Sequence, residues 1–177
     1  MASLLVKEHG FRRLGSGQYL SELAIEQGKG TSRAELQELG DTLDAATDYR
    51  WVIDEIVRGQ TAAEPKHDSW LFDSVRKTRQ LFHFKQIYQR LAYHAHLTAP
   101  DEVLQRRYEE RLVQGGEYVG TTPYSIARYH PNELESRRLI EAADIVVDVS
   151  SASPLEVVTD ILKQWRIRGE HESGSSD

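Results

Sequence analysis

The chain contains no cysteine, no long hydrophobic run and no excess of basic residues. The absence of cysteine excludes disulfides, thiolate nucleophiles and cysteine-based zinc sites, and it fits a reducing compartment. The apolar stretch after Met1 is too short for a signal peptide or a membrane span, so the sequence predicts a cytoplasmic protein with no membrane partner. With 22 basic and 28 acidic side chains, the chain also has no bulk field that would attract nucleic acid.

What the sequence does contain is an alternation of helix and strand signals. Its 177 residues are 39% hydrophobic, which is enough for one sizeable core. Helical apolar stripes alternate with short apolar runs, a pattern typical of an α/β protein with a largely parallel sheet. We therefore expect one α/β domain over residues 1–168 and a disordered polar tail over residues 169–177.

Local signals mark the individual elements. Gly10 predicts the end of a helix over residues 2–9, and capping boxes predict helices that begin after Ser32 and after Ser153. A further helix is expected from a cap at Asn132. The remaining apolar patterns predict helices over residues 51–57 and 100–112, and strands over residues 11–14, 70–72, 91–97 and 145–149.

Polar residues with phosphate-binding chemistry follow the predicted 70–72 strand. Arg76 and Gln80 are four residues apart and would share one face of a helix that begins directly after the strand. A guanidinium can bind two phosphate oxygens at once and stays charged at physiological pH. The alternative interpretation is a solvated basic turn, with Asp73 as a helix N-cap.

A second arginine pair, Arg107 and Arg111, has the same four-residue spacing on the predicted 100–112 helix. Gly115 and Gly116 follow and predict the end of that helix, and the next residues, rich in Tyr, Thr and Gly, predict a loop. The alternative is a set of Glu–Arg pairs on an exposed helix face. His94 and His96 alternate on a predicted strand, and we interpret them as structural or surface histidines in the absence of an obvious third metal ligand.

Three segments occur in an order that resembles a known family. Asp-x-x-Arg-x-x-x-Gln begins at Asp73, Thr-Ala-Pro-x-x-x-x-x-Arg-Arg-Tyr-x-x-Arg begins at Thr98, and Ala143-Asp144 precedes the last predicted strand. Together they are similar to the P-loop nucleoside monophosphate kinases, including adenylate kinase, dephospho-coenzyme A kinase and phage-type deoxynucleotide kinases. The resemblance extends over nearly the whole chain and implies a three-layer fold, a parallel sheet flanked by helices.

The resemblance also implies roles for individual residues. It implies an acceptor-binding segment over about residues 16–60 and a lid over residues 114–131, with ATP and Mg²⁺ as cofactors and a nucleoside monophosphate as partner. Arg76 would hold the acceptor phosphate, Gln80 would read the acceptor base, and Asp73 would hold Mg²⁺ through water. The other implied positions are Gln18 and Arg33 near the acceptor, Arg107 and Arg111 as phosphate clamps, and Arg128 and Arg138 on the returning side of the lid.

The chain departs from the family on the donor side, because it has no Walker A motif. The nearest sequence, Gly28-Lys29-Gly30-Thr31-Ser32, has the wrong spacing and is better interpreted as a flexible turn. Ser21 also stands where the family often has an acceptor-binding arginine.

The resemblance aligns residues 4–14 with the segment that follows the family's phosphate loop, so the first strand and the loop are expected to be missing, through truncation or a misassigned start. That strand normally lies beside both the 70–72 and the 91–97 strands. We therefore expect weak or no catalysis, and a partner chain or oligomer that completes the sheet. The alternative is a non-catalytic nucleotide-binding or protein-interaction module.

Overall fold

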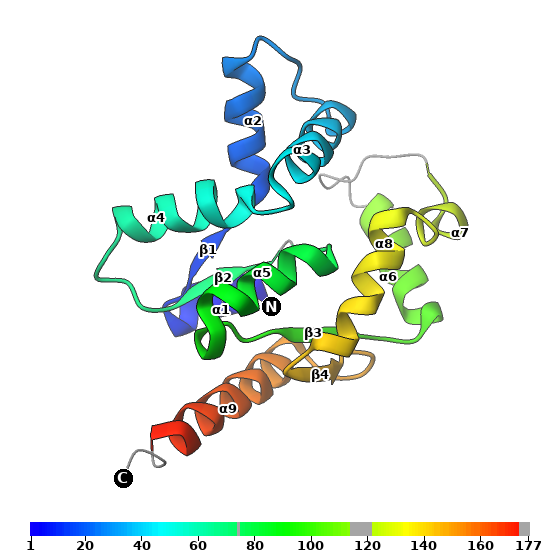
Figure 1. Ribbon diagram of the computed structural model, residues 1–177. Coiled ribbons are helices and arrows are strands. Elements are labelled where there is room, and N and C mark those ends of the chain that lie inside the picture. Colours follow the sequence, from blue (N-terminus) through cyan, green and yellow to red (C-terminus); the bar gives the residue numbers. More distant parts are fainter. Residues whose placement is uncertain (74, 114–121, 174–177) are drawn as a thin grey trace. The chain divides into compact units, whose positions relative to one another are not determined.

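The computed structural model describes residues 1–73, 75–113 and 122–173, apart from the side chains of Arg33 and of residues 168–173. The chain divides into two compact units. We call Ala2–Ala92 the N-terminal unit, and Tyr93–Asp177 together with Met1 the C-terminal unit. Each unit has its own parallel strand pair and its own helices (Figure 1).

The N-terminal unit is a strand–helices–strand arrangement. Strands β1 (Arg12–Leu14) and β2 (Trp70–Phe72) pair in parallel, with Arg12 opposite Trp70 and Leu14 opposite Phe72. Parallel neighbours require a long connection, and helices fill it here. The helical elements of this unit are α1 (Ala2–His9), α2 (Ser16–Glu26), α3 (Arg33–Thr47), the π-helix η1 (Val52–Val57), α4 (Arg58–Ala63), α5 (Thr78–Tyr88) and the 3₁₀ turn η2 (Gln89–Leu91).

Local sequence signals account for several of these boundaries. Gly10 follows α1 with a backbone φ of 71°, a conformation that residues other than glycine rarely adopt. The predicted helix end is therefore confirmed. Ser32 caps α3 through a capping box with Glu35, also as predicted. The predicted strand at residues 70–72 is likewise confirmed as β2.

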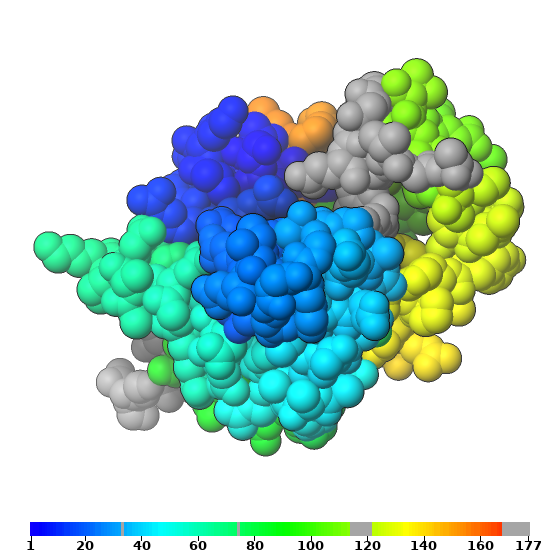
Figure 2. Space-filling model, turned by 90° about the horizontal axis from the view of Figure 1, so that it is seen from above, coloured from blue at the N-terminus to red at the C-terminus, as the bar shows by residue number. Residues whose placement is uncertain are grey.

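The core of the N-terminal unit lies between α2, α3 and η1. Leu20 and Ala24 of α2 pack with Leu39 of α3 and with Trp51 and Ile56. The ring of Tyr19 stacks on Trp51, with 5.7 Å between the ring centroids. The opposite surface of α2 and α3, coloured blue to cyan, is visible in Figure 2.

The C-terminal unit contains a second parallel pair. Strand β3 (Ala95–Thr98) pairs with β4 (Ile145–Asp148), with Ala95 opposite Ile145 and Thr98 opposite Asp148. Its helices are α6 (Asp101–Val113), α7 (Tyr124–Ala127), α8 (Pro131–Arg138), the 3₁₀ turn η3 (Leu139–Ala142) and α9 (Pro154–Ser173). Strand β4 packs on α9, because Val147 of the strand and Val149 just beyond it contact Val157.

The expectation of an α/β protein with parallel strand pairing is confirmed. The finer expectation was a three-layer P-loop sheet in one domain. The described strands form two two-stranded sheets, which neither confirm nor exclude it, so it stays a prediction. Some boundaries were wrong. The strand expected from residue 91 begins at Ala95, since residues 89–91 form a 3₁₀ turn. His130, not Asn132, caps α8. Helix α9 continues to Ser173, where a disordered tail was expected from Gly169.

Candidate functional site

The predicted acceptor motif begins at the carboxyl end of β2. Asp73 follows the strand, and its Oδ2 lies 2.9 Å from Nε of Arg13 on the neighbouring strand β1. A carboxylate at this end of a parallel strand is a suitable oxygen ligand for Mg²⁺. Within the described part of the chain, however, no three His, Asp or Glu side chains are grouped so that they could hold a metal ion. The predicted magnesium role of Asp73 therefore stays a prediction.

The expectation that Arg76 and Gln80 share one helix face is wrong. Helix α5 begins at Thr78, and Lys77 before it is still extended, with φ of -116° and ψ of 133°. Arg76 therefore lies in the connection between β2 and α5, while Gln80 lies in the first turn of the helix. The four-residue spacing does not place these two side chains together, because the helical repeat applies only inside a helix.

Gln80 belongs to a buried polar cluster. Its side-chain nitrogen donates to Oδ1 of Asp44 at 3.2 Å, and Nε1 of Trp51 donates to the same oxygen at 2.7 Å. The three residues are 7%, 6% and 4% exposed, respectively. A buried carboxylate needs such donors, so the cluster joins α5 to α3 and to the start of η1. The Gln80 amide is thus engaged in the core, and its predicted reading of a base remains untested.

Burial raises the pKa of the Asp44 carboxyl above its ordinary value of 3.8, although the hydrogen bonds from Trp51 and Gln80 lower it. The folded protein therefore holds this proton more tightly than the unfolded chain does. The contribution of Asp44 to stability consequently falls as the pH rises from 3.8 through the higher folded-state pKa.

Asp44→Asn is expected to remove this part of the pH dependence, since asparagine does not titrate. The free energy of unfolding of the variant, measured by urea denaturation from about pH 4 to about pH 7, should fall less with rising pH than that of the wild type. Glu38→Gln is the matched control, because Glu38 lies exposed on the same helix and does not contribute to the raised pKa of Asp44. Equal slopes for the two variants would contradict a raised pKa at Asp44.

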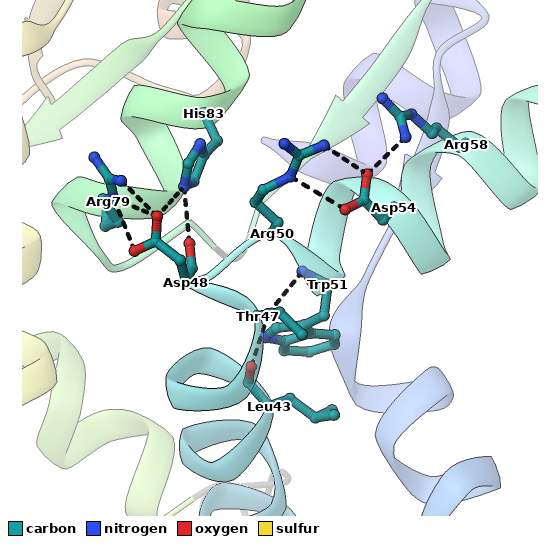
Figure 3. A network of polar contacts seen from close by, with 9 residues as sticks. All are labelled: Leu43, Thr47, Asp48, Arg50, Trp51, Asp54, Arg58, Arg79 and His83. Atoms are coloured by element: carbon teal, nitrogen blue, oxygen red, sulfur yellow. Dashed lines mark hydrogen bonds and ion pairs between the residues drawn. The ribbon is translucent and has the colours of Figure 1, made fainter.

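A second polar cluster lies at the surface end of the same region (Figure 3). Arg79 of α5 pairs with Asp48, the residue that follows α3. The Nε of Arg79 lies 2.9 and 3.0 Å from the two carboxylate oxygens. Nε2 of His83 donates to the Asp48 carbonyl oxygen at 2.8 Å and lies 3.3 Å from Oδ2 of the carboxylate. These contacts lower the pKa of the Asp48 carboxyl, mainly through the hydrogen bond from Arg79.

Beside this cluster, Figure 3 shows a run of ion pairs along one helical surface. Asp54 accepts from Arg50 at 3.2 Å and pairs with Arg58 at 2.7 Å, each four residues away. The side chains are partly exposed, so each pair contributes little stability, about 0.3–0.5 kcal/mol. We assign this run a structural role at the surface of η1.

The remaining predicted acceptor residues lie apart from these clusters. Gln18 donates to Glu22 at 2.8 Å within α2, on an exposed surface. Arg33 is the first residue of α3, and its side chain lies outside the described part of the structure. The predicted roles of both residues stay predictions.

In the C-terminal unit, Arg107 lies at the carboxyl end of the β3–β4 sheet. Its Nη2 donates to the carbonyl oxygen of Val149 at 2.6 Å, one residue beyond β4. Arg111 follows one helical turn later, and its Nε donates to the Arg107 carbonyl oxygen at 3.1 Å. Arg138 is the exposed last residue of α8. The predicted roles of Arg107 and Arg111 as phosphate clamps, and of Arg138 in the lid, stay predictions.

The sequence did not reveal the arginine cluster around Asp101. Arg128 pairs with the Asp101 carboxylate, Nη2 of Arg137 lies 3.6 Å from it, and the Tyr124 hydroxyl donates to it at 3.1 Å. Arg128 was predicted as a lid residue, but its neighbour here is Arg137 and not Arg138. The partners are up to 36 residues apart in sequence, so no local pattern indicates this grouping. Residues 114–121 of the predicted lid lie outside the described residues.

No protein-family model matches the chain, and no curated protein matches its sequence. Among the helices of the described residues, none is long and apolar enough to cross a lipid bilayer. The interpretation of function therefore depends on the residues and geometry above.

Proposed function

We propose that the chain is a nucleoside or deoxynucleoside monophosphate kinase-like protein, whose N-terminal unit binds the acceptor nucleotide and whose C-terminal unit carries phosphate-clamping arginines. The pairing of the strands is the main support. Among the described residues, β2 pairs only with β1, and β3 pairs only with β4. In the family that the chain resembles, the first strand lies between the strands that correspond to β2 and β3. A kinase-like sheet without this strand should therefore consist of two separate strand pairs.

Two features at the strand ends agree with this proposal. Asp73 follows β2, and Arg107 contacts the backbone just beyond β4, so both sheets present charged side chains at their carboxyl ends. Arg76 would bind the acceptor phosphate through its planar guanidinium, and Arg107 with Arg111 would neutralise charge on the transferring group. Asp73 would hold Mg²⁺ through water; ATP would supply the phosphoryl group, and the metal would neutralise its charge.

The chain has no recognisable segment for binding the phosphates of the donor, ATP. None of its glycine-containing segments has the Walker A spacing that surrounds the phosphates of ATP with backbone N–H groups. We therefore expect acceptor binding without appreciable phosphoryl transfer unless another segment supplies this loop. A non-catalytic nucleotide-binding module is the second candidate, and it shares the acceptor site.

Calorimetric titration with AMP, GMP, CMP, UMP and dTMP, followed by magnesium-ATP, tests the proposal. We expect at least one monophosphate to bind, and Arg76→Ala to weaken that binding about tenfold or more, since a bidentate charged contact is lost. Arg90→Ala is the control, because it removes the same charge from an exposed position of the same unit. The proposal is wrong if no monophosphate binds, or if both variants behave alike.

A further inference from the structure

The ion pair between Arg79 and Asp48 has the geometry of an occupied anion site (Figure 3). Nε of Arg79 lies 2.9 and 3.0 Å from the two Asp48 oxygens, and Nη2 also donates to Oδ2. One guanidinium thus binds both oxygens of a carboxylate, as arginine also does with two phosphate oxygens. The two side chains are 47% and 54% exposed, so a dissolved anion can reach them.

The Asp48 carboxylate reaches Arg79 from an uncommon backbone conformation. Asp48 and Tyr49 have φ values of 49° and 64°, which L-amino acids with side chains rarely adopt. Nε2 of His83, a residue that is 5% exposed, holds this turn by donating to the Asp48 carbonyl oxygen. The tertiary structure therefore brings a negative charge to Arg79 at a backbone cost.

Arg79 also makes a contact that does not involve Asp48. Its guanidinium carbon lies 4.9 Å from the centroid of the Phe82 ring, within the range of a cation–π contact. The residue is in the first turn of α5, three positions after Arg76. If the Asp48 carboxylate were displaced, the contact with the Phe82 ring would remain available to the guanidinium.

We propose that Arg79 is a phosphate-binding residue whose site Asp48 occupies as an internal competitor until an acceptor phosphate displaces it. The inference rests on the proposed function, because it assigns Arg79 to the same acceptor nucleotide as Arg76. A phosphate monoester carries a charge of about -1.5 to -2 at neutral pH, against -1 for a carboxylate, so it competes effectively for a guanidinium. Asp48 thereby lowers the affinity for weakly charged anions and favours dianionic phosphates.

Asp48→Asn tests this competition directly. Asparagine also tolerates the left-handed conformation, so the turn is retained while the charge is lost. We expect the variant to bind inorganic phosphate and the preferred monophosphate about three- to tenfold more tightly than the wild type, as loss of an exposed bidentate pair allows. Asp41→Asn, which removes the same charge from an exposed position of α3, should change both affinities by less than about twofold.

Substitutions of Arg79 should have the opposite effect on phosphate binding. Arg79→Ala and Arg79→Lys, the second of which keeps the charge without the planar fork, should each weaken phosphate binding and cancel the gain from Asp48→Asn. Phosphate added to the wild type should also shift the NMR signals of the Arg79 Nε–H group and the Asp48 carboxylate carbon. A structural ion pair would instead lower the melting temperature of Asp48→Asn without increasing phosphate affinity.

The outcomes separate this inference from the proposed function. If a monophosphate binds and Arg76→Ala abolishes that binding, but Asp48→Asn and Asp41→Asn behave alike, the competitor role of Asp48 is overturned and the acceptor site stands. If neither the wild type nor Asp48→Asn binds phosphate or any monophosphate, both proposals fail.

Discussion

Trp51→Ala is expected to lower the free energy of unfolding of the N-terminal unit by about 3–5 kcal/mol, as removal of a buried tryptophan usually does. Trp51 is 4% exposed at the centre of the cluster formed by α2, α3 and η1. Its loss leaves a cavity beneath the Tyr19 ring and removes one of the two donors that stabilise the buried Asp44 carboxylate. Urea denaturation followed by circular dichroism measures the effect.

Trp51→Phe separates packing from hydrogen bonding. This variant keeps an aromatic ring but lacks the indole N–H. It should therefore lower the free energy of unfolding by less than the alanine variant does, by about 1–3 kcal/mol for the lost hydrogen-bond donor. Ile25→Ala is the control, because Ile25 is 66% exposed on α2, and its effect should stay within about 0.5 kcal/mol. A small effect of Trp51→Ala would contradict the central position of this side chain.

Val157→Asp is expected to have a comparable or larger effect on the C-terminal unit, more than about 4 kcal/mol. Val157 is 2% exposed and packs against Val147 and Val149 at the contact between β4 and α9. A carboxylate placed there would have to lose its hydration without an ionic partner in this apolar cluster. The measurement is hydrogen exchange of the β4 amides, which should lose protection.

A control for this variant is available on the same helix. Leu155 is 54% exposed in the first turn of α9, so Leu155→Asp introduces the same charge at a hydrated position. An acidic residue near a helix N-terminus is also favourable, and its effect should stay within about 0.5 kcal/mol. If both aspartate variants lost protection equally, burial at Val157 would not explain the result.

Residue order alone predicted much of the local structure. Gly10, the Ser32–Glu35 capping box and the Ser153–Glu156 capping box lie within a few residues of the helix ends that they determine. These signals are short-range hydrogen bonds and backbone preferences, so they can be recognised without knowledge of the fold. The apolar run at residues 70–72 similarly predicted the position of Asp73 at a strand end.

The tertiary structure decided which polar groups meet. Gln80 pairs with Asp44, Arg79 with Asp48, and Arg128 with Asp101, across 36, 31 and 27 residues of sequence. Which residues become partners depends on how the helices pack. The type of a side chain does not indicate which distant polar residue will lie beside it in the fold. The same applies to the helix start at Thr78, which separates Arg76 from Gln80. The sequence thus determined the elements and their charges, whereas helix packing determined the clusters, because their partners are distant in the chain.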